Sequence, residues 1–588
     1  MSESSNKVLL SGNEAIARGV WEAGVTFGSG YPGTPSSEIL PALAKLGDVY
    51  AEWAVNEKCA LEAGAGASVA GARCIVTMKH VGLNVAADPL FTLAYVGVNG
   101  GMVIISADDP HMHSSQNEQD SRNYGRAAKI PILEPADTQE AYEYAKLALE
   151  MSERFDIPVL LRPTTRLCHS DGVVAIGERQ RLDRAFAPQR DPQKYVMIPA
   201  HARARRRSLA ERMHRLAEFA ETESINREEP GSAEVGIIAA GIAYEYAKDA
   251  MPEASFLKLG MSFPLPAERL RRFAASVEKL YVIEELDPFL ATEIAALGIK
   301  LEPLPESLQL GELNPNRVRA ALAGEDVAPV GDASLAPRPP VLCAGCPHRG
   351  VFLMLRKLKA FVTGDIGCYT LGTLPPLGAL HTCLCMGAGI GEAHGIDKAC
   401  GGPADTVAVI GDSTFLHSGI TGLLNIAYNN GRATVVILDN STTAMTGGQE
   451  HPATGRTLQG MPARRVDLEQ LCRACGVDHV QVVNPRETAV TEQAIRDAMA
   501  HEGPSVVIAR YPCVLVSRER GKAYVVNDEL CIRCGACLRL GCPAISKKAE
   551  TPGTETEGDR PRPIIDLALC QGCALCVQAC PKDAIAEA

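Results

Sequence analysis

The sequence has no long apolar run, no excess of positive charge and no hydrophobic leader. Its 588 residues carry a net charge of -12, which is unsuited to nucleic-acid binding because Lys and Arg must displace the counterions of phosphate groups. No apolar run approaches the roughly 18 residues that a membrane-spanning helix needs. Residues 1–10 are polar and lack the core of a signal peptide. We therefore expect a cytoplasmic protein that binds neither nucleic acid nor membranes.

Cysteine, in contrast, is abundant. The chain has 20 cysteines, and eight of them lie between residues 531 and 580. A reducing compartment disfavours structural disulfides, so metal ligation is the favoured use of these thiols. They form an internal repeat, because 525–531 resembles 564–570 and each half continues with Cys-x-x-Cys-x-x-Cys and a later Cys-Pro.

This repeat predicts two [4Fe-4S] clusters that exchange one ligand. In two-cluster ferredoxins three closely spaced cysteines bind one cluster and the remote fourth closes the other. The expected sets are Cys531, Cys534, Cys537 and Cys580 for the first cluster, and Cys542, Cys570, Cys573 and Cys576 for the second. The interval from Cys537 to Cys542 is one residue longer than usual, which predicts a small bulge. Zinc is the less favoured alternative, because it usually takes two separated cysteine pairs.

Apolar strands alternate with helical stretches through the rest of the chain, which predicts an α/β protein with parallel sheets. We expect strands at 74–78, 102–106, 157–161, 234–238, near Phe256, and at 280–284, 407–410, 434–438 and 505–509. The predicted domains are 1–175, 233–330, 338–516 and 517–588, with a helical linker at 176–232 and a proline-rich linker at 336–340.

Two patterns leave alternatives open. The basic run Arg203–Arg207, in a segment with helical periodicity over 208–222, is either a patch for an anionic partner or a solvated helical face, and we favour the latter. The glycine-rich segment Gly387–Gly391 is either a dinucleotide loop or a helix of small residues packed on a sheet, and we favour the helix.

Polar side chains follow two neighbouring strands of the third domain. Gly411, Asp412 and Ser413 come after the strand at 407–410, and Asn440 comes after the strand at 434–438, with a helix expected at 418–429 between them. Open α/β sheets bind ligands at the carboxyl ends of their strands. Magnesium takes about six oxygen ligands, often with phosphate oxygens among them. Asp412, Asn440 and the Thr442 carbonyl are the expected protein ligands, and a plain structural turn is the alternative.

The spacing of these two elements resembles the thiamine-diphosphate motif, Gly-Asp-Gly followed at a fixed interval by Asn. Ser413 departs from it, since the motif has glycine there. Thiamine catalysis also needs a carboxyl group facing the aminopyrimidine ring. Glu57, just before a small-residue helix expected at 60–72, is the candidate, and Glu52 and Glu62 are the alternatives.

Several stretches resemble 2-oxoacid:ferredoxin oxidoreductases, and among them the alpha subunits of indolepyruvate ferredoxin oxidoreductases. The first is Tyr31–Glu38, which carries the signature Tyr-Pro-x-Thr-Pro-Ser-Ser. The others are Thr77–Asp88, Asp108–Gln119, Cys343–Arg349, Gly364–Leu371 and Gly411–Gly419. Gly411-Asp-Ser413 itself matches this family, and the resemblance covers essentially the whole chain.

The resemblance implies a fold and a reaction. The fold has two thiamine-diphosphate-binding domains with doubly wound parallel sheets, a transketolase C-terminal-like domain between them and a C-terminal ferredoxin-like domain with two [4Fe-4S] clusters. The reaction converts an aryl pyruvate, coenzyme A and oxidised ferredoxin into aryl-acetyl-CoA, CO2 and reduced ferredoxin. A small beta subunit and an α2β2 assembly are implied as well. The competing hypotheses are a non-redox thiamine decarboxylase and an electron-transfer subunit with an inactive thiamine site.

The resemblance also assigns roles by position. Glu57 would activate the cofactor and Thr34 would contact the substrate carboxylate. The residues that would line the diphosphate are Gly411, Ser413, Gly367 and Cys368. The candidates for the substrate pocket are His111, His113, Ser114 and Gln116, with a surface loop as the alternative.

Four further cysteines match a set that binds a cluster close to thiamine in related enzymes: Cys343, Cys346, Cys368 and Cys513. We favour a third cluster there over a buried set of free thiols. The remaining cysteines are interpreted as small core residues: Cys59, Cys74, Cys168, Cys383, Cys385, Cys400, Cys472 and Cys475.

Overall fold

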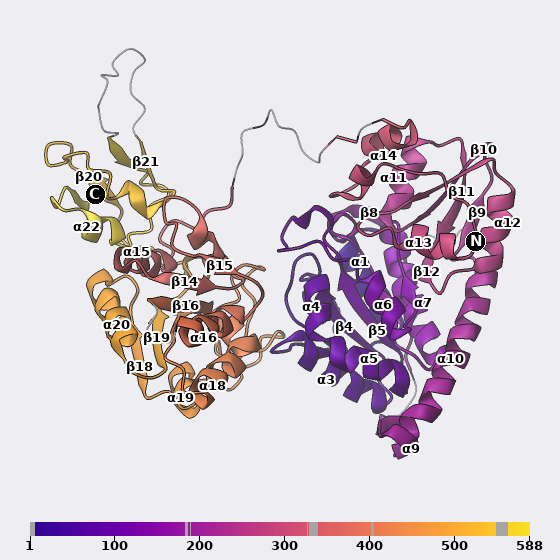
Figure 1. Cartoon of the computed structure of the whole chain (residues 1–588), viewed down its shortest axis with the longest axis horizontal. Helices are drawn as coiled ribbons and strands as arrows, with labels where there is room; N and C mark the ends of the chain where they lie inside the picture. The colour runs from indigo at the N-terminus through magenta and orange to yellow at the C-terminus, as the bar shows by residue number, and fades with distance from the viewer. Residues whose placement is uncertain are drawn as a thin grey trace, which may run out of the picture. The chain divides into compact units, whose positions relative to one another are not determined.

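In this computed structural model the chain forms two compact units, residues 1–335 and 336–588 (Figure 1). The structure describes residues 6–182, 186–188, 190–325, 327–328, 335, 339–400, 405–547 and 562–588. The proline-rich linker predicted at 336–340 falls largely outside these residues. Within the described ranges no helix combines the length and the apolar character needed to cross a bilayer.

A seven-stranded sheet in the order β12-β6-β7-β5-β4-β2-β3 is the centre of the first unit. Its strands are β2 (Phe27–Gly30), β3 (Tyr50–Trp53), β4 (Cys74–Lys79), β5 (Met102–Ala107), β6 (Ile132–Leu133), β7 (Val159–Leu161) and β12 (Met261–Phe263). All neighbours are parallel except β12 and β6. The predicted strands at 74–78 and 102–106 are confirmed, and the third, predicted at 157–161, begins at Val159.

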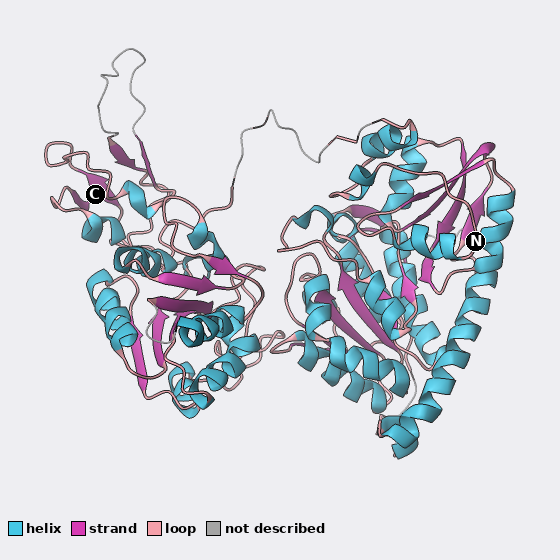
Figure 2. Cartoon of the chain, in the orientation of Figure 1, coloured by secondary structure: helices cyan, strands magenta, loops and turns pink. Residues whose placement is uncertain are grey.

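Helices cover both faces of this sheet (Figure 2), which explains why the central strands β4 and β5 are buried along nearly their whole length. The helices are α1 (Gly12–Glu22), α2 (Ile39–Lys45), α3 (Glu57–Val69), α4 (His80–Val85), α5 (Ala87–Val96), α6 (Arg122–Ala128), α7 (Thr138–Phe155) and α8 (Thr165–His169). The helix predicted at 60–72 is therefore α3, three residues earlier than expected. It starts there because the Asn56 side chain accepts a hydrogen bond from the Cys59 amide at 2.9 Å and caps the helix.

A second sheet of the first unit has four strands in the order β13-β10-β11-β9. They are β9 (Arg227–Glu229), β10 (Ser232–Ala240), β11 (Ala254–Leu259) and β13 (Lys279–Ile283), and they confirm the strands predicted in this part of the chain. The helices around it are α11 (Ile242–Ala250), α12 (Ala267–Ala275), α13 (Phe289–Ala296) and α14 (Pro315–Leu322). A short ladder of β1 (Asn6–Ser11) and β8 (Asp171–Ile176) completes the unit.

The interval 176–232, predicted as a helical linker, is built into this unit. Its helix α10 (Pro199–Thr222) buries Leu209 and Leu216, and its strand β9 pairs with β11. Arg205, from the predicted solvated face, donates to the Tyr95 carbonyl at 2.8 Å and to Asp156 at 2.9 Å. The solvated-face interpretation is wrong for this arginine, because its side chain is hydrogen-bonded to other parts of the unit. These partners are distant in sequence, so the local pattern did not indicate them. β12, from the predicted domain 233–330, likewise pairs with β6 of the first sheet.

The second unit contains a six-stranded parallel sheet in the order β15-β14-β16-β17-β19-β18. Its strands are β14 (Phe361–Gly364), β15 (Thr382–Cys383), β16 (Thr406–Gly411), β17 (Thr434–Asp439), β18 (His479–Val483) and β19 (Ser505–Arg510), which confirm the three predicted strands. Alternate side chains enter two separate cores: Val407 and Val409 one, Ala408 and Ile410 the other. The sheet is therefore buried on both faces, as expected of a doubly wound fold.

The helices of this part are α15 (His348–Leu358), α16 (Ala388–Cys400), α17 (Asp412–Thr414), α18 (Ile420–Tyr428), α19 (Leu468–Ala474), α20 (Thr488–Ala500) and α21 (Val514–Ser517), with a π-type turn η4 (Phe415–Gly419) before α18. Gly389 lies in the first turn of α16 against the sheet, where an added Cβ would lie 2.9 Å from the Gly364 carbonyl oxygen. The small-residue helix interpretation of Gly387–Gly391 is thus confirmed, and the predicted crossover helix is η4 and α18.

The tail forms two antiparallel ladders. β20 (Tyr524–Val526) pairs with β23 (Ile585–Glu587), and β21 (Ile545–Lys547) pairs with β22 (Pro563–Ile565). Each ladder therefore joins one half of the cysteine repeat to the other. Between them lie the short helices η5 (Leu538–Leu540) and α22 (Leu575–Ala579).

Candidate functional site

The first part of the site lies at the carboxyl ends of β16 and β17, which are adjacent parallel strands. Asp412 opens α17 and is almost fully buried, with 2% of its surface exposed. One carboxylate oxygen accepts the Ser441 amide at 2.8 Å, and the other accepts the Ser413 amide at 2.9 Å. Burial raises the pKa of Asp412, and the His451 ring nitrogen, 3.2 Å from the carboxylate, opposes that rise.

Asn440 and Thr442 complete the predicted metal ligands. Asn440 is buried at the end of β17, and its side-chain oxygen accepts the Thr442 amide at 3.3 Å. Two side-chain oxygens and a carbonyl at the ends of two adjacent strands are the hard donors that Mg2+ prefers, so these residues fit the ion chemically. Ser413 has a local role as well, because its hydroxyl accepts a 2.8 Å hydrogen bond from Thr443 across the turn.

Asp365 and Tyr369 belong to the same edge and were missed by the sequence analysis. Asp365 follows β14, is fully buried, and accepts hydrogen bonds from the Tyr369 hydroxyl and, at 3.1 Å, from the Gly387 amide. Burial raises the pKa of Asp365 to about 8. The Tyr369 ring leaves no room for a Cβ at Gly367 or Gly411, which would lie 2.3 and 2.7 Å from the ring. The sequence signal that could have identified Asp365 is an acidic residue directly after an apolar strand.

The structure brings the four cysteines of the predicted third set into one neighbourhood. Burial raises the pKa of Cys346 to about 12, and the charges of Cys368 and Cys343 add to that rise. Burial also raises the pKa of Cys368 to about 11, with Cys513 and Cys343 contributing. The set adjoins the predicted metal site, since the Cys513 amide donates to the Asn440 carbonyl at 2.9 Å.

Several cysteines interpreted as core residues differ in exposure. The interpretation is confirmed for Cys74, Cys168, Cys472 and Cys475, which are buried. It is wrong for Cys385 and Cys400, which are exposed. Cys59 and Cys383 lie between these extremes. The two errors share a cause, because both residues sit at turns or helix ends where apolar neighbours do not predict burial.

In the first unit, Glu57 is the buried carboxyl among the three candidates. It opens α3 with 5% of its surface exposed, and the helix N-terminus favours a negative charge there. Gly82 of α4 makes room for it, because a Cβ at that position would lie 2.5 Å from a Glu57 carboxylate oxygen. Glu62 instead forms a surface ion pair with Lys58, and Glu52 accepts hydrogen bonds from Ser29 and Tyr50.

Lys79 was not assigned a role from the sequence, yet it joins the predicted substrate residues. Its ammonium donates to the Ser114 carbonyl at 3.0 Å, and the Ser114 hydroxyl donates to the Thr34 carbonyl at 3.3 Å. Burial lowers the pKa of Lys79 to about 8, although the charges of Asp109 and Glu57 oppose the shift. A half-buried amine that titrates near neutrality beside a buried carboxyl is typical of functional sites.

Asp109 holds the loop that carries Ser114. Its carboxylate accepts the Ser114 amide at 2.9 Å, the Ser115 hydroxyl at 2.6 Å and the Thr165 hydroxyl at 2.7 Å. Burial alone would raise the pKa of Asp109, but these hydrogen bonds and the charge of Lys79 outweigh it and lower the pKa. The loop is therefore anchored, even though Ser114 itself is exposed.

The other predicted substrate residues are dispersed along this loop. The His113 ring lies 3.2 Å from Glu312, which also binds Arg166 through two 2.8 Å contacts. His111 packs edge-on against His113, with a φ of 70°. Gln116 is exposed and makes no hydrogen bond within the described part of the chain. The structure thus brings Thr34 and Ser114 together with Lys79 and leaves Gln116 at the surface.

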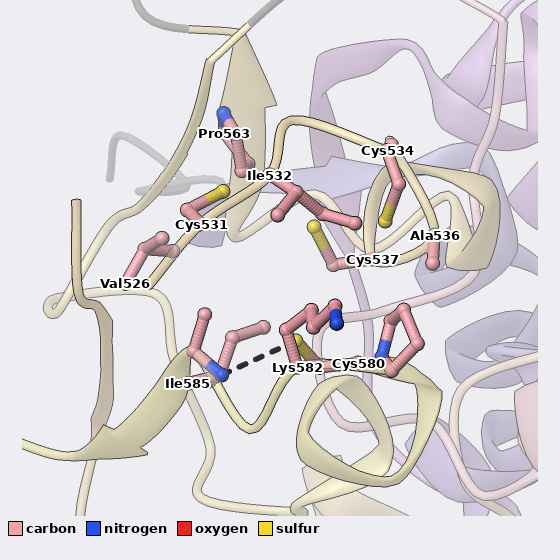
Figure 3. Close-up of a pocket in the computed structure, with 13 residues that line it drawn as sticks. Val526, Cys531, Ile532, Cys534, Ala536, Cys537, Pro563, Cys580, Lys582 and Ile585 are labelled. Atoms are coloured by element: carbon pink, nitrogen blue, oxygen red, sulfur yellow. Dashed lines mark hydrogen bonds between the residues drawn. The ribbon is translucent and has the colours of Figure 1, made fainter. Parts of the chain in front are cut away.

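The tail contains a pocket around the first predicted cysteine set (Figure 3). Its volume is about 340 Å³, part of it open to solvent. The sulfur-bearing side chains in its wall are Cys531, Cys534, Cys537 and Cys580. Cys580 accepts a hydrogen bond from the Ala584 amide at 3.4 Å, a contact of the kind that tunes cluster potentials.

A second pocket, of about 410 Å³, surrounds the other predicted set. Its cysteines are Cys542, Cys570, Cys573 and Cys576. The long interval before Cys542 is spanned by η5 and Gly541, whose φ of 62° lets the backbone turn there. In the described residues no three His, Cys, Asp or Glu side chains are gathered around a point that would hold a single metal ion.

Comparison with known proteins covers both units. Residues 18–229 match the model of the pyruvate flavodoxin/ferredoxin oxidoreductase thiamine-diphosphate-binding domain. Residues 365–509 match the C-terminal TPP-binding domain of thiamine pyrophosphate enzymes, and 517–584 match the 4Fe-4S dicluster domain.

Curated relatives extend along almost the whole chain. Indolepyruvate oxidoreductase subunit IorA of Archaeoglobus fulgidus is 41% identical, with 99% of this chain and 98% of that protein covered. The protein of the same name from Methanothermobacter marburgensis is 42% identical, with 99% and 97% covered. The chain belongs to the family of indolepyruvate oxidoreductase alpha subunits. A 2-oxoglutarate synthase subunit KorA from Archaeoglobus fulgidus is 27% identical over 47% of the chain.

As an indolepyruvate oxidoreductase alpha-subunit homologue, the chain is a thiamine-diphosphate-dependent oxidoreductase of the 2-oxoacid:ferredoxin type. Its tail is an iron–sulfur domain. The predicted fold class is confirmed, with parallel α/β sheets followed by the cluster domain. The individual ligands and the substrate residues remain predictions.

Proposed function

We propose that this chain is the alpha subunit of an enzyme that oxidatively decarboxylates aryl pyruvates of the indolepyruvate type. Coenzyme A accepts the aryl-acetyl group, CO2 leaves, and ferredoxin takes up the electrons. The supporting observation is the similarity of about 41% identity along nearly the whole chain to proteins named for indolepyruvate. The match covers 99% of the chain and so includes both units and the cluster domain.

The cofactor roles carry over from the family resemblance, and the geometry within each unit supports them. Thiamine diphosphate, when bound, supplies the nucleophilic carbon and the electron sink for decarboxylation. Glu57 would hold a proton against the aminopyrimidine ring. Asp412, Asn440 and the Thr442 carbonyl would hold Mg2+. The turns at Gly411–Ser413 and Gly367–Cys368 would line the diphosphate, since Tyr369 keeps both glycines close-packed.

The substrate carboxylate would be bound by Thr34 and Lys79. Lys79 offers an ammonium group, and its hydrogen bond to Ser114 places it on the same loop as the other substrate candidates. His113, held by Glu312, would approach the aromatic ring of the substrate. The positive charge of Lys79 would balance the negative charge of the substrate carboxylate until CO2 leaves.

Electrons would then pass through the clusters. Each tail pocket carries one of the interleaved cysteine sets, which supports two [4Fe-4S] clusters. The set Cys343, Cys346, Cys368 and Cys513 would hold a third, close to the metal site. A small beta subunit, in an assembly with two copies of each subunit, would complete the enzyme. Thiol-ligated clusters of this kind favour a cytoplasmic location.

The test is anaerobic co-purification with the small subunit, followed by reduction of a viologen dye. We expect indolepyruvate, phenylpyruvate and hydroxyphenylpyruvate to be oxidised with coenzyme A, at kcat/KM values well above those for pyruvate and 2-oxoglutarate. Aliphatic 2-oxoacids as the best substrates would contradict the aryl proposal. CO2 release without dye reduction would indicate a non-redox decarboxylase instead.

A further inference from the structure

Arg349 is a buried cation in the wall of the second tail pocket. It lies in the first turn of α15, outside the tail, and only 2% of its surface is exposed. The same pocket wall contains Cys542, Cys570, Cys573 and Cys576. A residue of the thiamine-binding sheet domain therefore reaches the predicted site of the second cluster.

The hydrogen bonds of Arg349 go to neutral acceptors. Its guanidinium donates to the Leu540 carbonyl at 2.7 Å, to the Leu342 carbonyl, and to the Cys343 carbonyl at 3.4 Å. Within the described part of the chain no carboxylate forms an ion pair with it. These bonds join the tail to the segment before α15, but they leave the positive charge without an anion.

The groups near Arg349 that can become negatively charged are cysteines, as thiolates. Burial lowers the pKa of Arg349, and the groups that oppose this shift are Cys542, Cys346, Cys573 and Cys343. A buried charge without a counter-ion is unfavourable, because burial removes the water that would solvate it. An anion in the pocket would remove that cost, and a cubane bound by four thiolates is such an anion.

The first pocket lacks this feature. The basic residue in its wall is Lys582, which is exposed to solvent (Figure 3). Water screens an exposed charge, whereas a buried one acts through a low dielectric. The two halves of the cysteine repeat are therefore similar in ligands and different in electrostatics.

We propose that Arg349 is the counter-charge of the cluster bound by Cys542, Cys570, Cys573 and Cys576 and raises its reduction potential. The proposal rests on the ligand set given under the proposed function. Accepting one electron makes the cluster one unit more negative, so a nearby fixed cation stabilises the reduced form more than the oxidised form. The second cluster would then be the better electron acceptor, and Arg349 would direct electrons from the thiamine domain into the tail.

The test is a redox titration of the intact complex, followed by electron paramagnetic resonance, with R349Q, R349K and K582Q. We expect R349Q to lower the equilibrium constant for reduction of one cluster at least tenfold, which is about 59 mV for one electron. R349K should stay close to the unmodified enzyme, since it keeps the charge. K582Q should shift neither cluster appreciably. C573S identifies the affected signal, because it alters the ligands of the second cluster.

The outcomes separate the two proposals. Absence of cluster signals or of iron in the unmodified complex would contradict the ligand assignment, whatever Arg349 does. Full iron content in R349Q with unchanged potentials would overturn the role of Arg349. If R349Q loses iron, the result for R349K separates the two explanations. A fully loaded second cluster with an unchanged potential in R349K would support the role of the positive charge. Loss of iron from R349K as well would show that only the hydrogen bonds of Arg349 matter.

Discussion

At the scale of single residues, Glu57 depends on the absence of a side chain at position 82. G82A would place a Cβ 2.5 Å from the Glu57 carboxylate and displace it. We expect kcat to fall on the order of 100-fold, the usual contribution of a positioned acid or base. The measurement is dye reduction by the complex at saturating substrate.

The matched control for G82A is G66A. Gly66 lies in α3, and a Cβ there meets nothing within 4 Å. This variant should keep its kcat. Equal activity of both variants would show that the Glu57 carboxylate does not need its present position.

Lys79 predicts a pH dependence of substrate binding. Because its pKa is lowered to about 8, the ammonium is charged below that pH and loses its charge above it. The KM for the 2-oxoacid should therefore rise as the pH passes through 8. K79M removes the charge at every pH and should raise KM roughly tenfold or more at pH 7, since a hydrogen bond to a charged group contributes about 1.5–3 kcal/mol.

The control is K58M, because Lys58 is a surface residue paired with Glu62. Its KM should match that of the unmodified enzyme. A KM that stays constant between pH 7 and pH 9 would rule out a role for Lys79 in binding the carboxylate.

At the scale of elements, Asp156 holds α10 to the rest of the first unit. Its carboxylate binds Lys194 at 2.9 Å, Arg205 at 2.9 Å and the buried Arg212 at 2.5 Å. D156N keeps a residue that tolerates the φ of 54° but removes the charge. We expect it to lower the stability of this unit by about 1–3 kcal/mol, seen as a lower melting temperature.

An exposed ion pair provides the comparison. Asp249 and Arg319 are 3.3 Å apart at the surface, and D249N should cost less than about 1 kcal/mol. A similar small loss in D156N would mean that α10 is held by its apolar face alone.

The turn before Cys542 is a second element with a specific requirement. Gly541 has a φ of 62°, and a Cβ there would lie 2.7 Å from the Pro376 ring. G541A should therefore lower the iron content of the purified complex by about a third, as one of the three proposed clusters is lost. G535A separates backbone strain from steric clash, because Gly535 has a φ of 70° but open space around its Cβ position. G535A bears the backbone strain without the clash and should retain most of its iron.

At the scale of the whole molecule, the proposal assigns one carboxyl group of each unit a separate role, Glu57 in activating the cofactor and Asp412 in binding Mg2+. E57Q should keep thiamine diphosphate and lose 2-oxoacid oxidation, because the amide cannot exchange the proton. D412N should lose the cofactor itself, because the amide binds Mg2+ weakly. Cofactor content after gel filtration and dye reduction distinguish the two. Full turnover by E57Q would remove Glu57 from the mechanism, and full cofactor content in D412N would remove Asp412 from the metal site.

Much of the fold was predictable because its signals are local. The apolar runs at β4, β16 and β17 are strands in the structure, since a parallel strand buried on both faces must be apolar throughout. The ends of the helices and of the domains were harder to predict. α3 begins at Glu57 because of the Asn56 cap, and the predicted linker at 176–232 is packed into the first unit. The start of α3 and the packing of this segment both depend on side-chain contacts, which the spacing of hydrophobic residues does not reveal.

By itself, then, the sequence determined the order of the main strands and helices, and it predicted the division of eight cysteines into two interleaved ligand sets. Spacing within a short segment dictates which thiols can reach one cluster. Only the tertiary structure decided which distant residues meet: Lys79 with Ser114, Asp365 with the glycine at 387, and Arg349 with Leu540. Those contacts depend on how sheet order and burial bring separate segments together, and no local pattern encodes them.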